Sequence, residues 1–543
     1  MTPSGGARSS ALLNSALALV FAAGAAAAQG YDPALRSLDL AHDPLARSPR
    51  LVGMGRLTWV VDDPHNRLAL WDFAGNPTGL YDADTSSTFD LRPATASRSD
   101  VADRATSTGK VEDQLRAGRD VGIGYETWRR TSQANAYGAI GEFLMRRSDQ
   151  PFSDASELRN ELSLPRMVAA VSGGMPFVLS NRMRYALRVH LGSEKSNDDY
   201  RQIVNGPFGQ LLDRDGTLMD PPELFKPDRY HTSIFGGGLA ASYQVGRLAT
   251  AAIGYDHVGH SISADNTGQR YRSEVTEPRG YDIGQATVLG RVGDHFEWGV
   301  VGNGWTSSSQ QNWRFTISAG VGGTPFQGRG KLLERKEEGS NLRARARWVI
   351  GPLEIGGGLN TGYRKITTTP PALDDLTSFN HFLDVLYDYV NADTIAIPDS
   401  VVANESQERR WEGGGGVSVR LPGDRGVLGV EYHRAENLFE QVRSGSGPKQ
   451  VASDVRGGLE FVCSPVLRGR LGYIYRWEDR DEFTRANEYV GHTLTGGFGL
   501  RPAKASWTVE SGYAIEWLQA DFGDPATPRG SDQRLALQIR WAF

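Results

Sequence analysis

The C-terminal stretch RLALQIRWAF, residues 534–543, alternates strictly between two kinds of side chain. Leu535, Leu537, Ile539, Trp541 and Phe543 are apolar or aromatic, and the residues between them are small or polar. Because a β-strand sends successive side chains to opposite faces, this pattern predicts one apolar and one polar surface. The apolar surface faces either the core of a soluble sheet or the lipid around a membrane barrel. Other segments of the chain must decide between the two.

The same alternation recurs along the chain, with arginines on the polar face. RMRYALRVHL, 182–191, and LRARARWVI, 342–350, each carry three of them on that face. A globular core cannot bury so many guanidinium groups without partners, so these faces are expected to meet water in a barrel lumen. The inward arginines predicted in this way are Arg182, Arg184, Arg188, Arg343, Arg345, Arg347, Arg468, Arg470 and Arg476.

The connections between the predicted strands alternate in length. Short turns are expected at 350–352, 423–425, 464–465 and 501–503, and long polar loops at 195–229, 261–281 and 366–407, among others. Short turns on one rim and long loops on the other are typical of outer-membrane barrels. The spacing predicts an all-β fold, a transmembrane antiparallel β-barrel of about 18 strands, with about 16 to 20 as the accepted range.

The N-terminus has the features of an export signal. Residues 1–28 carry Arg8, a short apolar stretch and an alanine-rich end, which predicts a signal peptide cleaved after Ala28. No later run is long and apolar enough for a membrane helix, and the mean hydropathy is -0.41. Residues 29–85 are then an N-terminal segment on the periplasmic side or in the lumen, and 86–543 form the barrel.

Composition and motifs exclude several function classes. The net charge of -5 is small for 543 residues, which gives no reason to expect a nucleic-acid partner. The single cysteine, Cys463, cannot form an internal disulfide. Metalloprotease, serine-hydrolase and phosphate-loop motifs are absent, so we expect no catalytic residues and no enzyme.

Two motifs resemble those of known barrels. The alternating C-terminus with Trp541 and terminal Phe543 resembles the recognition signal of bacterial outer-membrane β-barrels, which implies an outer-membrane location, surrounding lipid and recognition by the insertion machinery. Asn76, Pro77, Gly79 and Leu80 resemble the N-P-A-G-[LM] motif before the first strand of FadL-like transporters of long-chain fatty acids and hydrocarbons, with Thr78 departing from the usual Ala. That resemblance implies a lumenal plug formed by residues before the motif.

One predicted loop contains an apolar helix. Residues 370–393 follow a double proline and place apolar side chains at helical spacing. In the FadL-like family, helices in the extracellular loops form a hydrophobic capture site. The alternative is a lid that packs on neighbouring loops. The apolar residues are Leu373, Leu376, Phe379, Phe382, Leu383, Leu386, Tyr387 and Val390.

Charged residues suggest two further sites. Oxygen ligands spaced around Gly216 suit a calcium ion, with solvated loop carboxylates as the alternative; no other cofactor is expected. These ligands are Asp213, Asp215, Asp220 and Glu223. The inward arginines either select anionic ligands or form salt bridges with inward acids such as Glu354, Glu431 and Glu460.

These features together predict passive uptake of a small hydrophobic or amphiphilic molecule. The ligand, whose carboxylate would meet lumenal arginines, would pass a constriction formed by residues 29–75. The alternatives are a general or anion-preferring diffusion porin and a non-transporting barrel with a structural or secretion-shuttle role.

Overall fold

The computed structural model describes residues 48–61, 88–105, 111–130, 136–152, 156–160, 169–173, 183–196, 229–246, 248–267, 271–293, 295–317, 326–369, 404–441, 449–482, 485–520 and 528–542. This part of the chain is almost entirely β-strand, with one short α-helix, α2, and one 3-10 turn. The fold class predicted from the sequence, a transmembrane antiparallel β-barrel, is confirmed.

The strands of the first half of the chain differ greatly in length. They are β1 (Thr88–Ala105), β2 (Val111–Arg130), β3 (Ala136–Phe152), β4 (Ser156–Asn160), β5 (Ala169–Gly173), β6 (Met183–Ser196), β7 (Arg229–Val245), β8 (Ala249–Thr267), β9 (Tyr271–Val292) and β10 (Phe296–Ile317). The second half contains β11 (Phe326–Ile350), β12 (Leu353–Thr369), β13 (Asn404–Arg420), β14 (Gly426–Gln441), β15 (Lys449–Ser464), β16 (Leu467–Glu482), β17 (Arg485–Leu500), β18 (Trp507–Ala520) and β19 (Pro528–Ala542). Helix α2 spans Pro49–Gly53, and the 3-10 turn η6 spans Pro422–Asp424.

Antiparallel pairing closes the sheet on itself. Apart from β4 and β5, each strand pairs with its neighbours in sequence, and β1 pairs with both β2 and β19. Strands β4 and β5 both pair with β3, at its two ends, so they share one position in the ring. The 19 strands of the described residues therefore occupy 18 positions, in agreement with the spacing of the sequence.

The seam between the first and last strands carries a buried ion pair. Asp90 of β1 is 1% exposed and accepts hydrogen bonds from Arg540 Nε and Nη2 at 2.7 and 2.6 Å. Gln538 Nε2 donates to the same carboxylate at 3.0 Å. On the other face of the sheet, Trp541 packs against Phe89 with the ring centroids 5.7 Å apart. The last strand is thus joined to the first on both faces.

The short turns gather at one end of the barrel, which we call the short-turn end. Gly246, Gly293 and Gly351 adopt positive φ in the turns β7–β8, β9–β10 and β11–β12, a conformation that glycine reaches without steric cost. One predicted long loop is wrong. Residues 261–281 are mostly strand, since β8 continues to Thr267 and β9 begins at Tyr271. The segment is polar because both of its faces lie beyond the apolar band described next. A strand that is polar on both faces has the same composition as a loop, so the sequence predicts a loop here.

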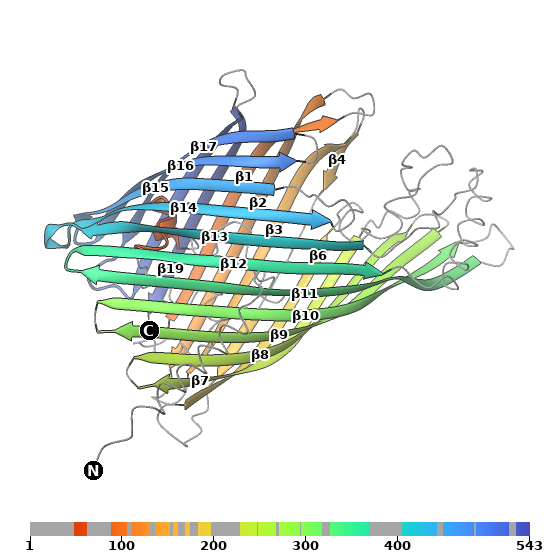
Figure 1. Cartoon of the computed structure of the whole chain (residues 1–543), viewed down its shortest axis with the longest axis horizontal. Helices are drawn as coiled ribbons and strands as arrows, with labels where there is room; N and C mark the ends of the chain where they lie inside the picture. The colour runs from red at the N-terminus through yellow and green to blue at the C-terminus, as the bar shows by residue number, and fades with distance from the viewer. Residues whose placement is uncertain are drawn as a thin grey trace, which may run out of the picture.

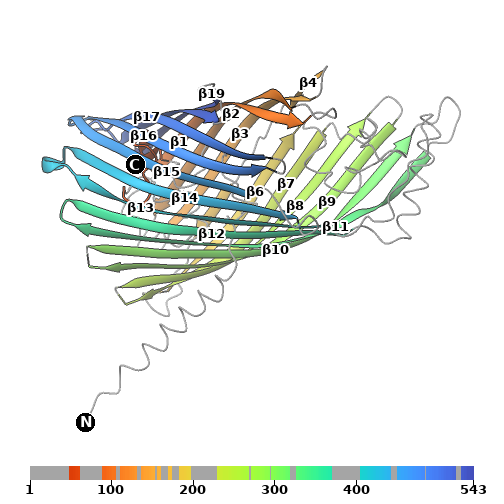
Figure 2. The ribbon, with the colours of Figure 1, turned by 45° about the horizontal axis from the view of Figure 1, so that its top comes forward.

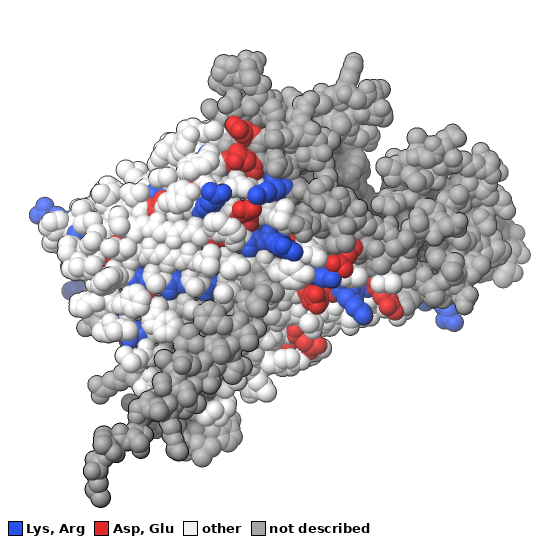
Figure 3. Space-filling model, viewed as in Figure 1, with Lys and Arg blue, Asp and Glu red and all other residues white. Residues whose placement is uncertain are grey.

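The outer face of the barrel is apolar near the short-turn end and polar beyond it. Exposed Leu, Val and Ile residues alternate with buried polar ones on β7 to β18. Aromatic side chains such as Trp348 and Trp507 stand near the short-turn end, and Tyr432 and Trp477 farther along. This pattern is typical of a lipid-facing band between two aromatic girdles. Figure 3 shows the pale band and, beside it, a zone where charged residues gather.

The strands extend to different lengths beyond this band. A strand needs about 9 to 11 residues to span a bilayer. Strands β9 and β10 have 22 residues each and β11 has 25, whereas β18 has 14. Figures 1 and 2 show β9 to β11 extending past the ends of β14 to β17. No helix within the described residues reaches the length and apolarity that crossing a membrane requires.

Candidate functional site: the lumenal segment 48–61 and its wall

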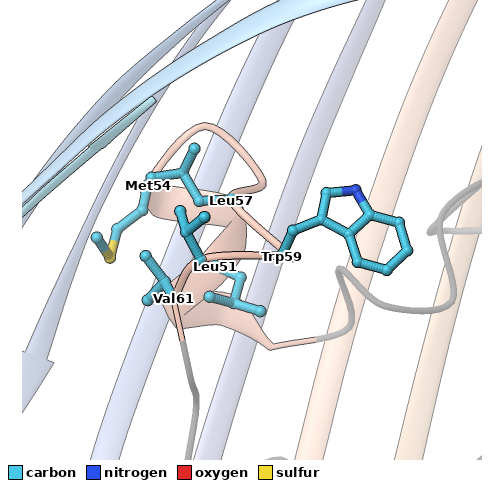
Figure 4. Packing of buried hydrophobic residues seen from close by; sticks show 6 residues of the cluster. Leu51, Met54, Leu57, Trp59 and Val61 are labelled. Carbon is cyan, nitrogen blue, oxygen red and sulfur yellow. The ribbon is translucent and has the colours of Figure 1, made fainter. Parts of the chain in front are cut away.

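Residues 48–61, which we call the lumenal segment, lie against the inner face of the barrel wall (Figures 1 and 2). The segment starts with α2, where the Ser48 hydroxyl accepts a hydrogen bond from Leu51 N and Pro49 occupies the first turn. Gly55 and Arg56 then adopt positive φ and turn the chain. Figure 4 shows Leu51, Met54, Leu57 and Val61 gathered around this turn, with Trp59 extending away from them.

Glu431 on β14 holds the end of this segment. Its side chain is fully buried, and its Oε1 accepts hydrogen bonds from the backbone N–H groups of Trp59 at 2.6 Å and Val60 at 2.8 Å. Its Oε2 accepts from Thr58 N at 2.9 Å and contacts His433 Nε2 at 2.7 Å. A carboxylate that accepts several backbone N–H bonds is satisfied without a cationic partner.

His433 extends this contact to the indole of Trp59. Trp59 Nε1 lies 3.2 Å from His433 Nδ1, and the two rings stack with centroids 5.9 Å apart. Because an indole N–H can only donate, we assign Nδ1 as the acceptor and place the imidazole proton on Nε2, from which it is donated to Glu431. Trp59, His433 and Glu431 therefore form one chain of hydrogen bonds from segment to wall.

Two further ion clusters fasten the start and middle of the segment. Arg50 donates to Glu460 from Nε at 2.8 Å and from Nη2 at 2.9 Å, and Arg470 Nε donates to the same carboxylate at 2.7 Å. Arg456 Nη1 donates to the carbonyl oxygen of Arg56 at 3.1 Å, while its Nε pairs with Asp454. The segment is held along its length by charged groups that the wall supplies.

Inward-facing glycines let the segment lie close to the wall. A Cβ added at Gly458 would lie 2.0 Å from the carbonyl oxygen of Met54, and one at Gly512 would lie 2.2 Å from that of Pro49. At Gly356 it would lie 2.1 Å from the Trp59 carbonyl oxygen. Real Cβ atoms do not approach oxygen so closely, so these positions admit only glycine while the segment is in place.

The inward arginines predicted from the sequence are found on the lumenal face wherever their side chains are described. Arg347 pairs with Glu297 at 2.7 Å, and Arg345 Nη2 donates to the Trp59 carbonyl oxygen at 3.3 Å. Arg470 pairs with Glu460 and Glu510, and Arg468, at the rim, with Glu460 at 3.2 Å. Arg343 lies on the same face of β11. These contacts favour the salt-bridge alternative over an unpaired anion-selecting wall.

Several predicted site residues fall outside the described part of the chain. They comprise Arg182, the turn motif Asn76, Pro77, Gly79 and Leu80, the apolar loop residues 373–390, the acidic set Asp213, Asp215, Asp220 and Glu223, and Phe543. Arg184 and Arg188 lie on β6, but their side chains are not described. Within the described ranges, no group of three or more His, Cys, Asp or Glu side chains is placed to hold a metal ion.

A second charged cluster lines the high wall beyond the apolar band. Arg279 forms a two-pronged pair with Glu277 at 2.6 and 2.9 Å, and Ser309 donates to the same carboxylate. Burial opposes ionisation of Glu277, but the hydrogen bond and charge of Arg279 outweigh it and hold the pKa of this carboxyl below its ordinary value. Glu337 is paired in the same way with Arg364 at 3.0 Å.

The sequence points to inward acids such as Glu431 and Glu460 but not to what they bind. Their partners are backbone N–H groups and Arg50 from a segment 371 to 410 residues earlier, which no local pattern reveals. The clearest overlooked signal is the glycine content of the wall: runs at 356–358 and 413–416 lie opposite each other on β12 and β13, beneath Trp59.

Comparisons with known proteins give weak similarity only. No protein-family model matches the chain, and no curated protein matches it. Similar solved structures include the CymD monoaromatic hydrocarbon channel, at 10% identity and a TM-score of 0.34, covering 92% of this chain and 98% of that one. The toluene transporter TbuX of Ralstonia pickettii is 9% identical with a TM-score of 0.35, covering 93% and 100%.

The unliganded ferric citrate transporter FecA is 8% identical with a TM-score of 0.38, covering 84% of this chain and 78% of that one. All three of these structures are named as channels or transporters, and two of them, those of hydrocarbons, are of the FadL type. Because the identities and TM-scores are this low, the function of the chain has to be inferred from its own residues.

Proposed function

We propose that the chain is a bacterial outer-membrane barrel for passive uptake of a small hydrophobic or amphiphilic molecule, with the lumenal segment as a fixed constriction. The observation that carries this proposal is the attachment of residues 58–60 to Glu431 by three backbone hydrogen bonds. An open diffusion porin has no use for a segment held in this way. The export signal at 1–28 and the C-terminal motif support the outer-membrane location.

The segment leaves part of the wall uncovered. Its contacts lie with β16 to β19 through α2 and with β11 to β15 through residues 54–60. A ligand would therefore pass between the segment and the wall on the opposite side, formed by the strands before β11. The apolar loop 373–390 remains the candidate for first capture. The hydrophobic effect supplies about 25 cal/mol per Å² of apolar ligand surface buried, and no energy source is needed.

The test is conductance of the refolded mature chain in planar bilayers, compared with a variant that lacks residues 48–61. We expect the full chain to be nearly silent and the deletion variant to conduct. Uptake of labelled p-xylene by cells that express the full chain is measured alongside. A large, steady conductance of the full chain would favour the porin alternative, and silence of both proteins without p-xylene uptake would favour the non-transporting alternative.

A further inference from the structure

The lumenal face of β10 to β12 contains polar side chains that the protein itself does not satisfy. Trp305 Nε1, Asn303 Oδ1, Asn341 Oδ1 and Asn360 Oδ1 are shielded from solvent and have no hydrogen-bond partner. Trp305 is 3% exposed and Asn360 is 5% exposed. Buried polar groups in native proteins are nearly always paired, so such a group in one place calls for an explanation. We call these four residues the lumenal amide patch.

Strand register brings the patch together. Asn303 on β10 lies directly opposite Asn341 on β11, and Trp305 is the next residue on the same face of β10. Asn360 on β12 lies opposite Arg343, which is the next inward residue after Asn341. Residues opposite or diagonal on one face of a sheet are within reach of one ligand. Asn303, Asn341 and Trp305 thus present two amides and an indole to one place on the lumenal face, and Asn360 lies at the edge of this place, level with Arg343.

An apolar surface adjoins the patch. Ile283 on β9 lies opposite Trp305, and Val258 on β8 faces the lumen beside it; both are buried. The Trp305 ring covers Gly339 of β11, where an added Cβ would lie 2.2 Å from the indole. The lumen of a membrane barrel is ordinarily polar, so an apolar surface next to unsatisfied amides is an exception.

The donors and acceptors define the ligand. The indole N–H can only donate, so it requires an acceptor atom, whereas the Asn Oδ1 atoms require a donor. A hydroxyl group supplies both, and the apolar residues fit a hydrocarbon or aromatic body. The nearest inward arginine, Arg343, already has an interaction of its own. The patch therefore suits a neutral ligand rather than an anion.

We propose that the lumenal amide patch and the adjoining Ile283 and Val258 bind a neutral, hydroxyl-bearing hydrophobic molecule, of the phenol or alcohol class. The proposal rests on the proposed function and narrows its substrate class. The patch lies on β10 to β12, at the border between the wall that the segment 48–61 contacts and the strands before β11, where a passing ligand would meet it.

The test compares two probes of nearly equal shape, p-cresol and p-xylene, by calorimetric titration of the refolded full chain. We expect p-cresol to bind about tenfold more tightly, since it makes at least one further hydrogen bond. Trp305→Phe and Asn303→Leu should each lower the affinity for p-cresol toward that for p-xylene. Trp298→Phe, the same change on the lipid-facing side of β10, is the matched control and should alter neither affinity.

A second readout separates binding from a structural role. Replacing an unsatisfied buried amide by an isosteric apolar side chain is neutral or stabilising. Asn303→Leu and Asn341→Leu should therefore leave the melting temperature of the ligand-free barrel unchanged or raise it, while p-cresol affinity falls. Equal affinity of the two probes for the unaltered chain would overturn the proposal, as would a clear loss of ligand-free stability in both Asn variants.

Failure of the proposed function would look different. Selective p-cresol binding without uptake of either probe by cells would sink the uptake role and leave the binding site intact. Uptake of both probes with no selectivity in binding would leave the uptake role and remove the amide patch as a binding site.

Discussion

Replacing Glu431 by Gln should loosen the lumenal segment from the wall. The substitution keeps the size of the side chain but turns one carboxylate oxygen into an amide NH₂. Gln Oε1 can still accept from Trp59 N and Val60 N, which now donate to Glu431 Oε1. The new NH₂ would face Thr58 N–H and the His433 Nε2–H, which now contact Oε2. The Thr58 N–H and the His433 Nε2–H would then point at the NH₂ group, which is itself a donor, in a position that is fully buried.

The magnitude follows from these bonds. Each hydrogen bond to a charged group contributes about 1.5–3 kcal/mol, so two lost bonds cost at least about 3 kcal/mol. At 1.4 kcal/mol per factor of ten, the population of the detached segment should rise about a hundredfold or more. Amide exchange proceeds through such open states, so exchange at residues 58–60 should accelerate by a similar factor.

The assay is hydrogen–deuterium exchange with mass spectrometry on the refolded barrel. Glu488→Gln, a change of the same kind at an exposed position on β17, is the control and should leave exchange at residues 58–60 unaltered. If Glu431→Gln folds and residues 58–60 exchange as slowly as before, Glu431 is not what holds the segment, and the proposed constriction loses its main support.

Three other substitutions test further contacts. Gly458→Ala should speed amide exchange at residues 54–57, because the added Cβ would lie 2.0 Å from the Met54 carbonyl oxygen. Gly457→Ala is the control and should not change this exchange, because a Cβ added there would have nothing within 4 Å. Equal exchange rates in the two variants would contradict the close approach of the segment to Gly458. Glu277→Gln should lower the thermal midpoint at neutral pH by the equivalent of about 1–3 kcal/mol. Because the pKa of Glu277 is lowered in the folded protein, the stability that its carboxylate contributes is present above the ordinary carboxylate pKa and is lost as the pH falls through the lowered value. The thermal midpoints of variant and parent should therefore converge in acid. A difference between the two midpoints that does not change with pH would refute the ion pair. Asp90→Asn should reduce the yield of refolded barrel, since it removes the counter-charge of the Arg540 guanidinium, which is 16% exposed, while exposed Asp479→Asn should not. Matching yields would show that the seam does not depend on this pair.

The sequence was sufficient for the barrel because alternation is a local property. RLALQIRWAF and LRARARWVI each specify two faces, and the register in the structure places Arg343, Arg345 and Arg347 together on the lumenal side. The sequence does not reveal the strands within 261–281, because a strand beyond the bilayer has no apolar face to distinguish it from a loop. The attachment of Trp59 to Glu431 joins residues far apart in sequence, and only the closed ring sets them opposite each other. Likewise, the unsatisfied Asn303 and Asn360 look like ordinary polar strand residues until their surroundings are seen.

The seam at Asp90 also has a consequence for folding kinetics. Its partners Gln538 and Arg540 stand about 450 positions later in the chain, near its very end. A contact between residues so far apart in sequence must first close a long loop, which costs conformational entropy before the contact contributes any stability. Pairing of this kind forms slowly. Until the last strand is in place, β1 presents an unpaired edge, which is a site for aggregation. Completion of the ring therefore waits for β19, which pairs with β1 from Gly530 to Ala542, and a chain without β19 would lose its means of closing.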